Sequence, residues 1–180
     1  MSLADQLTVA RAAAVPIVIA LYAWDFPNHA YWATAVFIAA MATDQVDGWL
    51  ARRQGRTSEL GSLLDPMADK LLTLSTLVML VGVFEAWMVA LIVVRELLVA
   101  ALRLAALERG VVIHARDLGK LKAWAQAVAA AIGGFAAAGA WGDRPAWWAL
   151  LVALILTWVS GLDYVRAAPG LLRNRTPASA

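Results

Sequence analysis

Long apolar segments separated by short polar ones run along the whole chain. The apolar segments have the length of helices rather than strands. About 20 apolar residues in an α-helix cross the roughly 30 Å hydrocarbon core of a bilayer. Ahead of the first segment lies a short amphipathic stretch, residues 3–11, which is typical of a segment lying in the membrane interface. The expected transmembrane helices cover residues 12–24, 31–52, 66–84, 86–107, 118–141 and 145–165.

This pattern predicts an all-α integral membrane bundle of six transmembrane helices with a short N-terminal interfacial segment. Composition agrees, because 62% of the residues are hydrophobic and 16% are charged, against about 45–50% and about 25% in soluble domains. We expect one domain, residues 1–180. The absence of cysteine excludes disulfides and thiolate chemistry. The N-terminus does not have the pattern of a secretory signal, so we expect the helices themselves to hold the protein in the membrane.

The basic residues predict the orientation of the bundle. With six spans and the N-terminus in the cytoplasm, only Arg144 of the fifteen Lys and Arg residues falls in an outer loop. Such asymmetry is typical of cytoplasmic loops and favours both termini inside. Aromatic residues at the expected outer ends would form an interfacial belt. They are Trp24, Tyr31, Trp32, Trp87, Trp141, Trp147 and Trp148.

Four aspartates form two pairs at helical spacing. Asp44 and Asp47 are three residues apart and Asp65 and Asp69 are four apart, so each pair shares a helix face. The two helices are consecutive and joined at the cytoplasmic end, which brings all four carboxylates toward one point. Four close negative charges require protonation or a bound cation. Oxygen ligands alone favour a hard cation, Mg²⁺, Mn²⁺ or Ca²⁺.

Small residues and one arginine accompany the carboxylates. Gly48 and Ala51 follow one turn after the first pair and leave room for a large group against the backbone, and Gly61 continues this in the loop. Arg52 is a permanent cation suited to a bidentate phosphate contact. The segment therefore favours phosphoryl chemistry with a metal ion.

At these residues the chain resembles the CDP-alcohol phosphotransferases. Its spacing from Asp44 to Asp69 reads Asp-x2-Asp-Gly-x2-Ala-Arg-x8-Gly-x3-Asp-x3-Asp, eight fixed residues over 26 positions, and matches the family signature. Further likeness covers most of the chain and points to the phosphatidylglycerophosphate synthase branch. The segments that carry it are Leu7-Thr8-x2-Arg11-x4-Pro16, Asp65-Pro-Met-Ala-Asp-Lys70, Arg95-Glu96, Leu102-Arg103 and Gly119-Lys-Leu-Lys122 with Gln126.

The resemblance implies a six-helix enzyme, usually a homodimer, that moves a phosphatidyl group from CDP-diacylglycerol to an alcohol and releases CMP. Glycerol 3-phosphate is the implied acceptor, and a bacterial inner membrane with the active site facing the cytoplasm is the implied location. Membrane lipids are expected partners and nucleic acids are not. The implied metal ligands are Asp44, Asp47, Asp65 and Asp69, holding one or two Mg²⁺ or Mn²⁺ ions, with Asp69 also the general base. The implied CDP-diacylglycerol contacts are Gly48, Ala51, Arg52, Ser58 and Gly61, with Thr8 and Arg11 as neighbours.

The acceptor phosphate needs cations that the pyrophosphate does not already use. Four basic residues at the cytoplasmic side of the fourth and fifth helices are candidates, although Lys120 and Lys122 do not share a helix face. Membrane orientation or attraction to anionic lipids also explains the basic cluster of Arg109, Arg116, Lys120 and Lys122. Arg103 is alternatively a partner of Glu96, seven residues before it on the same face. The candidates are Arg103, Arg116, Lys120 and Lys122.

Other interpretations stay open at this stage. Within the family, another acceptor such as inositol phosphate fits the same chemistry. Outside it, intramembrane carboxylates are also found in divalent-cation transporters. The small residues of 127–140, Gly133 and Gly134 among them, indicate close helix packing, either within one chain or between two.

Overall fold

The computed structural model describes the backbone of residues 3–54, 59–108 and 117–166, and the side chains of residues 9–43, 68, 70–106 and 118–162. Six α-helices account for nearly all of this part of the chain, which contains no β-strand and only an isolated bridge between Val81 and Phe84. The all-α prediction is confirmed for these residues. The helices are α1 Leu3–Ala23, α2 His29–Gln54, α3 Glu59–Met79, α4 Ala86–Glu108, α5 Asp117–Ala137 and α6 Arg144–Arg166.

Two boundaries differ from the sequence prediction at the start of helices. The expected interfacial segment 3–11 is not a separate element, since α1 runs unbroken from Leu3 to Ala23. Helix α3 begins at Glu59, seven residues before the expected start at Pro66. Proline favours the first turn of a helix, but here the helix has already formed before it. Asp65 and Asp69 therefore lie within one continuous helix.

The ends of α3 and α5 come earlier than predicted, and glycine explains both. After α3, Gly82 has φ 124°, and its backbone N–H donates to the carbonyl of Phe84 in a tight turn. After α5, Gly139 has φ 80°, and the N–H of Ala140 donates to the carbonyl of Phe135. This left-handed residue with a returning hydrogen bond is the usual glycine cap of a helix.

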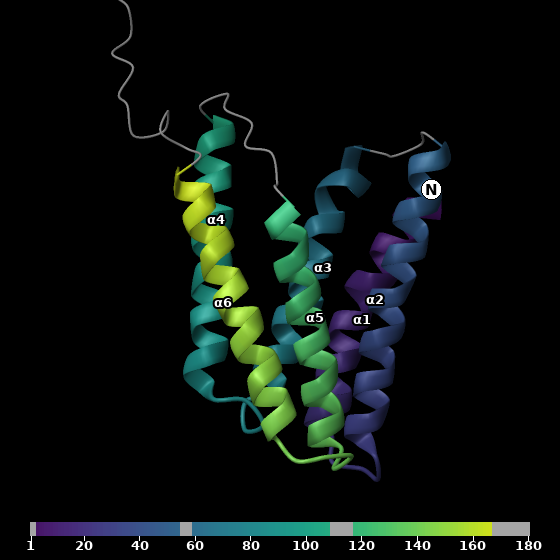
Figure 1. Cartoon of the computed structure of the whole chain (residues 1–180). Helices are drawn as coiled ribbons and strands as arrows, with labels where there is room; N and C mark the ends of the chain where they lie inside the picture. The colour runs from purple at the N-terminus through teal and green to yellow at the C-terminus, as the bar shows by residue number, and fades with distance from the viewer. Residues whose placement is uncertain (1–2, 55–58, 109–116, 167–180) are drawn as a thin grey trace, which may run out of the picture.

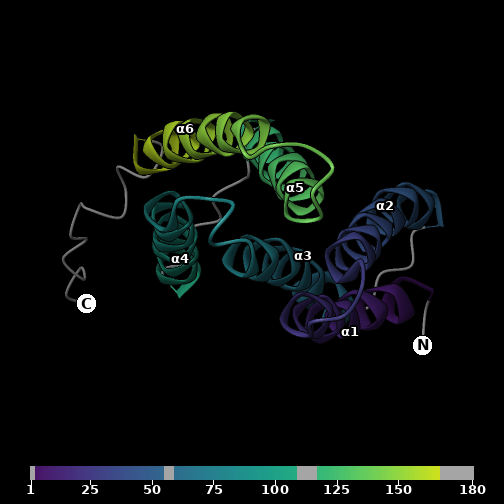
Figure 2. The same cartoon turned by 90° about the horizontal axis from the view of Figure 1, so that it is seen from below.

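The helices run up and down and pack in two groups (Figures 1 and 2). Helix α1 packs on both α2 and α3, while α6 packs on both α4 and α5. The main contact between the groups is that of α2 with α5. Buried side chains such as Phe37, Leu72, Met88, Ile92 and Leu150 form one apolar core through both groups.

Two consecutive glycines bring α5 close to the first group. A Cβ atom added to Gly133 would lie 2.3 Å from Cζ of Phe84, and one on Gly134 would lie 2.2 Å from Oγ1 of Thr34. Tyr22 and Thr34 share a hydrogen bond of 3.0 Å beside Gly134. These glycines therefore serve packing within one chain, one of the two alternatives that the sequence left open.

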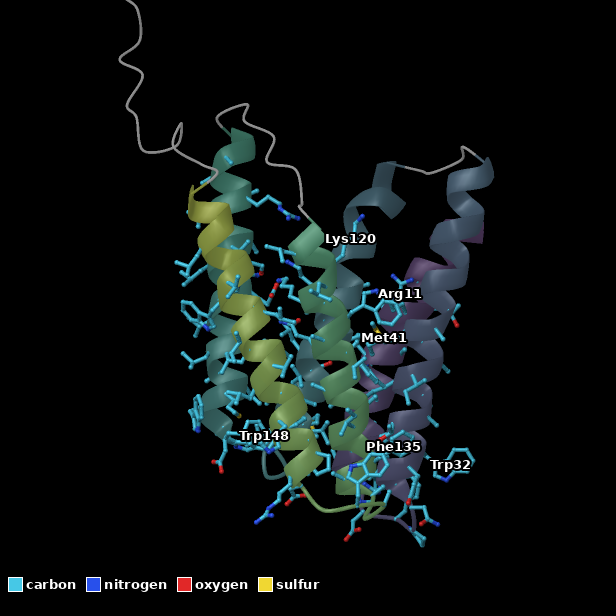
Figure 3. All side chains as sticks on the ribbon, viewed as in Figure 1. Arg11, Trp32, Met41, Lys120, Phe135 and Trp148 are labelled. Atoms are coloured by element: carbon cyan, nitrogen blue, oxygen red, sulfur yellow. The ribbon has the colours of Figure 1, made fainter. Side chains whose placement is uncertain are left out.

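The two ends of the bundle carry different side chains, with tryptophans toward one end and basic residues toward the other. The links α1–α2, α3–α4 and α5–α6 lie at one end (Figure 1). Trp32 and Trp148 lie toward it, while Arg11 and Lys120 lie toward the opposite end (Figure 3). Within the described residues, the stretch Arg144–Leu162 is long and apolar enough to cross a membrane by itself.

Candidate functional site

Both aspartate pairs lie toward the end of the bundle that carries the N-terminus. Asp44 and Asp47 belong to the second half of α2, and Asp65 and Asp69 to the first half of α3. Helix α2 ends and α3 begins at this same end (Figure 1). Each pair therefore keeps its helix spacing, and the aspartate-bearing halves of α2 and α3 lie toward the same end of the bundle. The convergence of the four carboxylates on one point stays a prediction.

The predicted contacts to CDP-diacylglycerol lie on α1, α2 and α3. Gly48, Ala51 and Arg52 lie in the last turns of α2, Gly61 lies in the first turn of α3, and Thr8 lies in α1. Ser58 lies outside the described residues, and the side chains of these residues and of the four aspartates lie outside the described side chains. Their roles therefore stay predictions.

The donor set of the four aspartates fits a hard divalent cation. The two carboxylate pairs, each spaced by about one helix turn on α2 and α3, supply only oxygen ligands, which Mg²⁺ and Mn²⁺ prefer. Among the described side chains, which do not include these four, no group of three His, Asp or Glu residues gathers elsewhere. The chemistry of the four residues fits such an ion, and their role as its ligands stays a prediction.

Arg11 is buried, with 4% of its surface exposed, on the helix that packs against both aspartate-bearing helices. A buried guanidinium is costly without charged or polar partners, and Arg11 does have a polar interaction. Figure 3 places it toward the end of the bundle where α2 and α3 are joined. This position favours its predicted place next to the donor site.

The basic candidates for the acceptor phosphate separate into different environments. Lys120 is exposed on α5, Lys122 two residues later is buried, and Arg103 on α4 is half-buried. The prediction that Lys120 and Lys122 lie on different faces of one helix is confirmed. Arg116 lies outside the described residues.

Lys122 contacts the carboxylate of Glu96, which is itself buried on α4. Arg95 donates from Nη1 to the same oxygen, Glu96 Oε1, at 3.0 Å, and Gln126 Nε2 lies 3.4 Å from it. The suggested ion pair of Glu96 with Arg103 is therefore wrong: Glu96 does orient α4, but through α5 and its own neighbour. Spacing along one helix suggested Arg103, whereas contacts between helices decide the partner.

Helix α6 completes this buried polar network. Arg95 Nη2 donates to Ser160 Oγ at 2.6 Å, and Gln126 Nε2 donates to Thr157 Oγ1 at 2.7 Å. Gly161 makes room for the guanidinium, since a Cβ there would lie 2.9 Å from Arg95 Nε. Thr157 and Ser160 were not predicted from the sequence. Two hydroxyl side chains one turn apart in an otherwise apolar helix were the feature of the sequence that could have indicated a buried polar contact.

Comparison with known proteins adds an independent line of evidence. Residues 1–159 match the sequence profile of the CDP-alcohol phosphatidyltransferase family. A CDP-diacylglycerol–glycerol-3-phosphate 3-phosphatidyltransferase of Bacillus subtilis (strain 168) is 40% identical over 142 residues, which cover 71% of this chain and 74% of the relative.

Two further relatives have comparable similarity. A probable phosphatidylglycerophosphate synthase of Mycobacterium tuberculosis (strain CDC 1551 / Oshkosh) is 38% identical over 172 residues, 93% of this chain and 81% of the relative. A CDP-diacylglycerol–glycerol-3-phosphate 3-phosphatidyltransferase of Pseudomonas fluorescens is 38% identical over 136 residues, 73% of this chain and 68% of the relative.

Proposed function

Because the chain belongs to the CDP-alcohol phosphatidyltransferase family, we propose that it transfers a phosphatidyl group from CDP-diacylglycerol to sn-glycerol 3-phosphate. The products are phosphatidylglycerophosphate, an intermediate of phospholipid biosynthesis, and CMP. The observation that carries the proposal is the placement of the two aspartate pairs on α2 and α3 at one end of the bundle. The names of the three relatives support glycerol 3-phosphate as the acceptor.

The proposal includes six membrane spans, with both termini and the active site on the cytoplasmic side of a bacterial inner membrane. Exposed tryptophans such as Trp32 and Trp148 support a membrane interface at the opposite end of the bundle, because Trp is enriched at both interfaces of a membrane. The basic residues support the orientation, since only Arg144 falls in an outer loop when the N-terminus is inside. Large apolar side chains exposed along α4 and α6, such as Leu97, Leu98, Val152 and Ile155, would face lipid or a second chain of a homodimer.

Asp44, Asp47, Asp65 and Asp69 would hold one or two Mg²⁺ or Mn²⁺ ions. Bound there, the metal would offset the charge of the pyrophosphate and of the departing CMP. The family's chemistry and the all-oxygen donor set support this assignment. Arg52 and Arg11 add permanent cations on α2 and α1 for the phosphates, and Gly48, Ala51 and Gly61 leave space for the nucleotide beside the helix backbone.

The reaction itself needs one proton transfer and one exchange of bonds at phosphorus. A carboxylate oxygen of Asp69 takes the proton from the acceptor hydroxyl, as a general base. The hydroxyl oxygen bonds to the lipid-linked phosphorus, and the bond from that phosphorus to the oxygen of the CMP phosphate breaks with its electron pair. CMP leaves as the anion with the bridging oxygen. The bond between diacylglycerol and its phosphorus is not broken, so the apolar part stays in the membrane throughout.

The acceptor carries its own phosphate dianion, and we assign its binding to the basic side chains of α4 and α5. Lys120 is exposed at the beginning of α5 and is the first candidate. Arg103 and Arg116 come from α4 and the following link. Lys122 is the weakest of the four, because its ammonium group already contacts Glu96.

CMP release by the purified protein tests the function. The protein in detergent receives CDP-diacylglycerol and Mg²⁺ or Mn²⁺, and each acceptor separately: glycerol 3-phosphate, inositol phosphate or serine. We expect release with glycerol 3-phosphate alone. Release with inositol phosphate alone would preserve the reaction class and overturn the acceptor. No release with any acceptor, from folded protein that binds Mg²⁺, would favour a divalent-cation transporter.

A further inference from the structure

Glu96 connects the two groups of helices near the predicted catalytic end. The buried side chains of Lys122, Arg95 and Gln126, on α4 and α5, all contact its Oε1 atom. Its other oxygen, Oε2, lies 3.4 Å from Nζ of Lys70, on α3. One carboxylate therefore joins α3 to α4 and α5.

The ion pair of Lys70 with Glu96 lies next in the chain to the predicted general base. Lys70 directly follows Asp69, the predicted general base, in α3. Helix α3 packs chiefly on α1, whereas α4 and α5 pack on α6. The aspartates thus belong to one group of helices, and the basic candidates for the acceptor phosphate belong to the other. The ion pair of Lys70 with Glu96 bridges these groups one residue from Asp69.

The two carboxylate oxygens of Glu96 have partners that differ in solvent exposure. Its partners Arg95 and Lys122 have side chains only 4% and 10% exposed, and removing one member of a buried ion pair leaves a costly uncompensated charge. Lys70 is 38% exposed, so water screens its ion pair and the pair adds little stability. Glu96 is therefore fixed to α4 and α5, and its contact with Lys70 matters more for where α3 lies than for stability.

We propose that Glu96 is a positioning residue, which through Lys70 sets the turn of α3 that carries Asp69 relative to the basic side chains of α4 and α5. The inference rests on the proposed function, in which Asp69 and the acceptor phosphate site must act on the same glycerol 3-phosphate. An attacking hydroxyl must be held about 3–3.5 Å from its target, and a displacement of about 1 Å costs up to about 100-fold in rate.

Lys70→Met tests the proposal with little risk to folding, because the lysine is partly exposed and methionine retains an unbranched apolar chain. We expect kcat to fall by up to about fivefold, the largest loss of the productive arrangement that removal of one partly exposed ion pair can cause, with both KM values within about twofold of the unaltered enzyme. Lys70→Arg should restore most of the activity. Lys70→Met combined with Glu96→Gln should have the same kcat as Glu96→Gln alone, since both act through one contact.

Ser160→Ala is the matched control. It removes a hydrogen bond from Arg95 on the α6 side of the same network, away from α3. We expect it to lower the melting temperature while kcat stays unchanged. If Lys70→Met behaves in this way as well, Lys70 and Glu96 are only structural and the proposal is overturned.

A distance measurement tests the inference without activity. The chain contains no cysteine, so spin labels at Leu71→Cys on α3 and Leu121→Cys on α5, both exposed, report the spacing of the two helices. Lys70→Met should shift or broaden the distance distribution, and Ser160→Ala should not. An unchanged distribution in Lys70→Met would overturn the proposal. If the unaltered protein releases no CMP, the function is what fails, and the distances alone decide this inference.

Discussion

Asp69 is the residue to which the proposed reaction assigns proton transfer, and its replacement separates that role from metal binding. The amide of Asp69→Asn keeps the size and one ligand oxygen but cannot take a proton. Because a general base contributes about 100- to 10,000-fold, we expect kcat to fall by that range while binding of Mg²⁺ and CDP-diacylglycerol is partly retained. CMP release and equilibrium binding measure the two effects.

Asp25→Asn is the control for this variant. Asp25 is exposed between α1 and α2, at the opposite end of the bundle. The same chemical change there should leave both kcat and binding unaltered. Comparable activity in Asp69→Asn would remove Asp69 from the role of base.

Lys120 and Lys122 offer a second comparison at the residue scale, because two lysines in one helix turn have opposite environments. Lys120→Ala should raise the KM for glycerol 3-phosphate about 10-fold or more, the value of one hydrogen bond to a charged group, with little change for CDP-diacylglycerol. A larger rise in the KM of CDP-diacylglycerol would place Lys120 at the pyrophosphate instead. Lys122→Ala should mainly lower the melting temperature, since it leaves Glu96 buried without that cation.

At the scale of helices, apolar length and periodicity were enough to predict the number and class of elements. Residues 86–107 and 145–165 were expected and Ala86–Glu108 and Arg144–Arg166 are observed. The start of α3 was missed because Pro66 is a good first residue of a helix and was taken as one. The ends of α3 and α5 were missed because a glycine's φ depends on the turn that follows, which periodicity does not report.

The contact of α5 with the first group of helices gives a prediction at this scale. Gly133→Ala would place a methyl group 2.3 Å from the buried ring of Phe84. Because the ring is buried in the core and must shift to admit the methyl group, we expect destabilisation of about 1–3 kcal/mol, the usual cost of overpacking. Thermal unfolding in detergent would measure it.

Gly119→Ala provides the matched control in the same helix. A Cβ on Gly119 meets nothing within 4 Å. Alanine is favoured over glycine in a helix by up to about 1 kcal/mol, so this variant should be as stable as the unaltered chain or more so. An equal loss of stability in both variants would show that α5 does not tolerate alanine for a reason other than Phe84.

At the scale of the whole molecule, the sequence predicted which helices carry the aspartate pairs, but it did not predict the polar network around Glu96. The helices that carry the aspartate pairs were predicted because both pairs lie close together along the chain and each has helical spacing. The network around Glu96 was not, because its members come from α3, α4, α5 and α6, and one sequence does not tell which helices are neighbours. Lys70, Thr157 and Ser160 acquire their meaning only when those helices are placed side by side.

The orientation of the bundle in the membrane is a property of the whole molecule, and the absence of cysteine makes it directly measurable. Lys120 and Arg144 are both exposed and lie at the beginning of α5 and α6, toward opposite ends of the bundle. Basic residues are retained on the cytoplasmic side, and fourteen of the fifteen in this chain fall there if the N-terminus is inside. A membrane-impermeant maleimide should therefore label Arg144→Cys in intact cells and Lys120→Cys only in inverted vesicles. The reverse result would place the aspartate pairs outside, away from the cytoplasmic supply of glycerol 3-phosphate. It would therefore contradict the proposed reaction, which needs that acceptor at the aspartates.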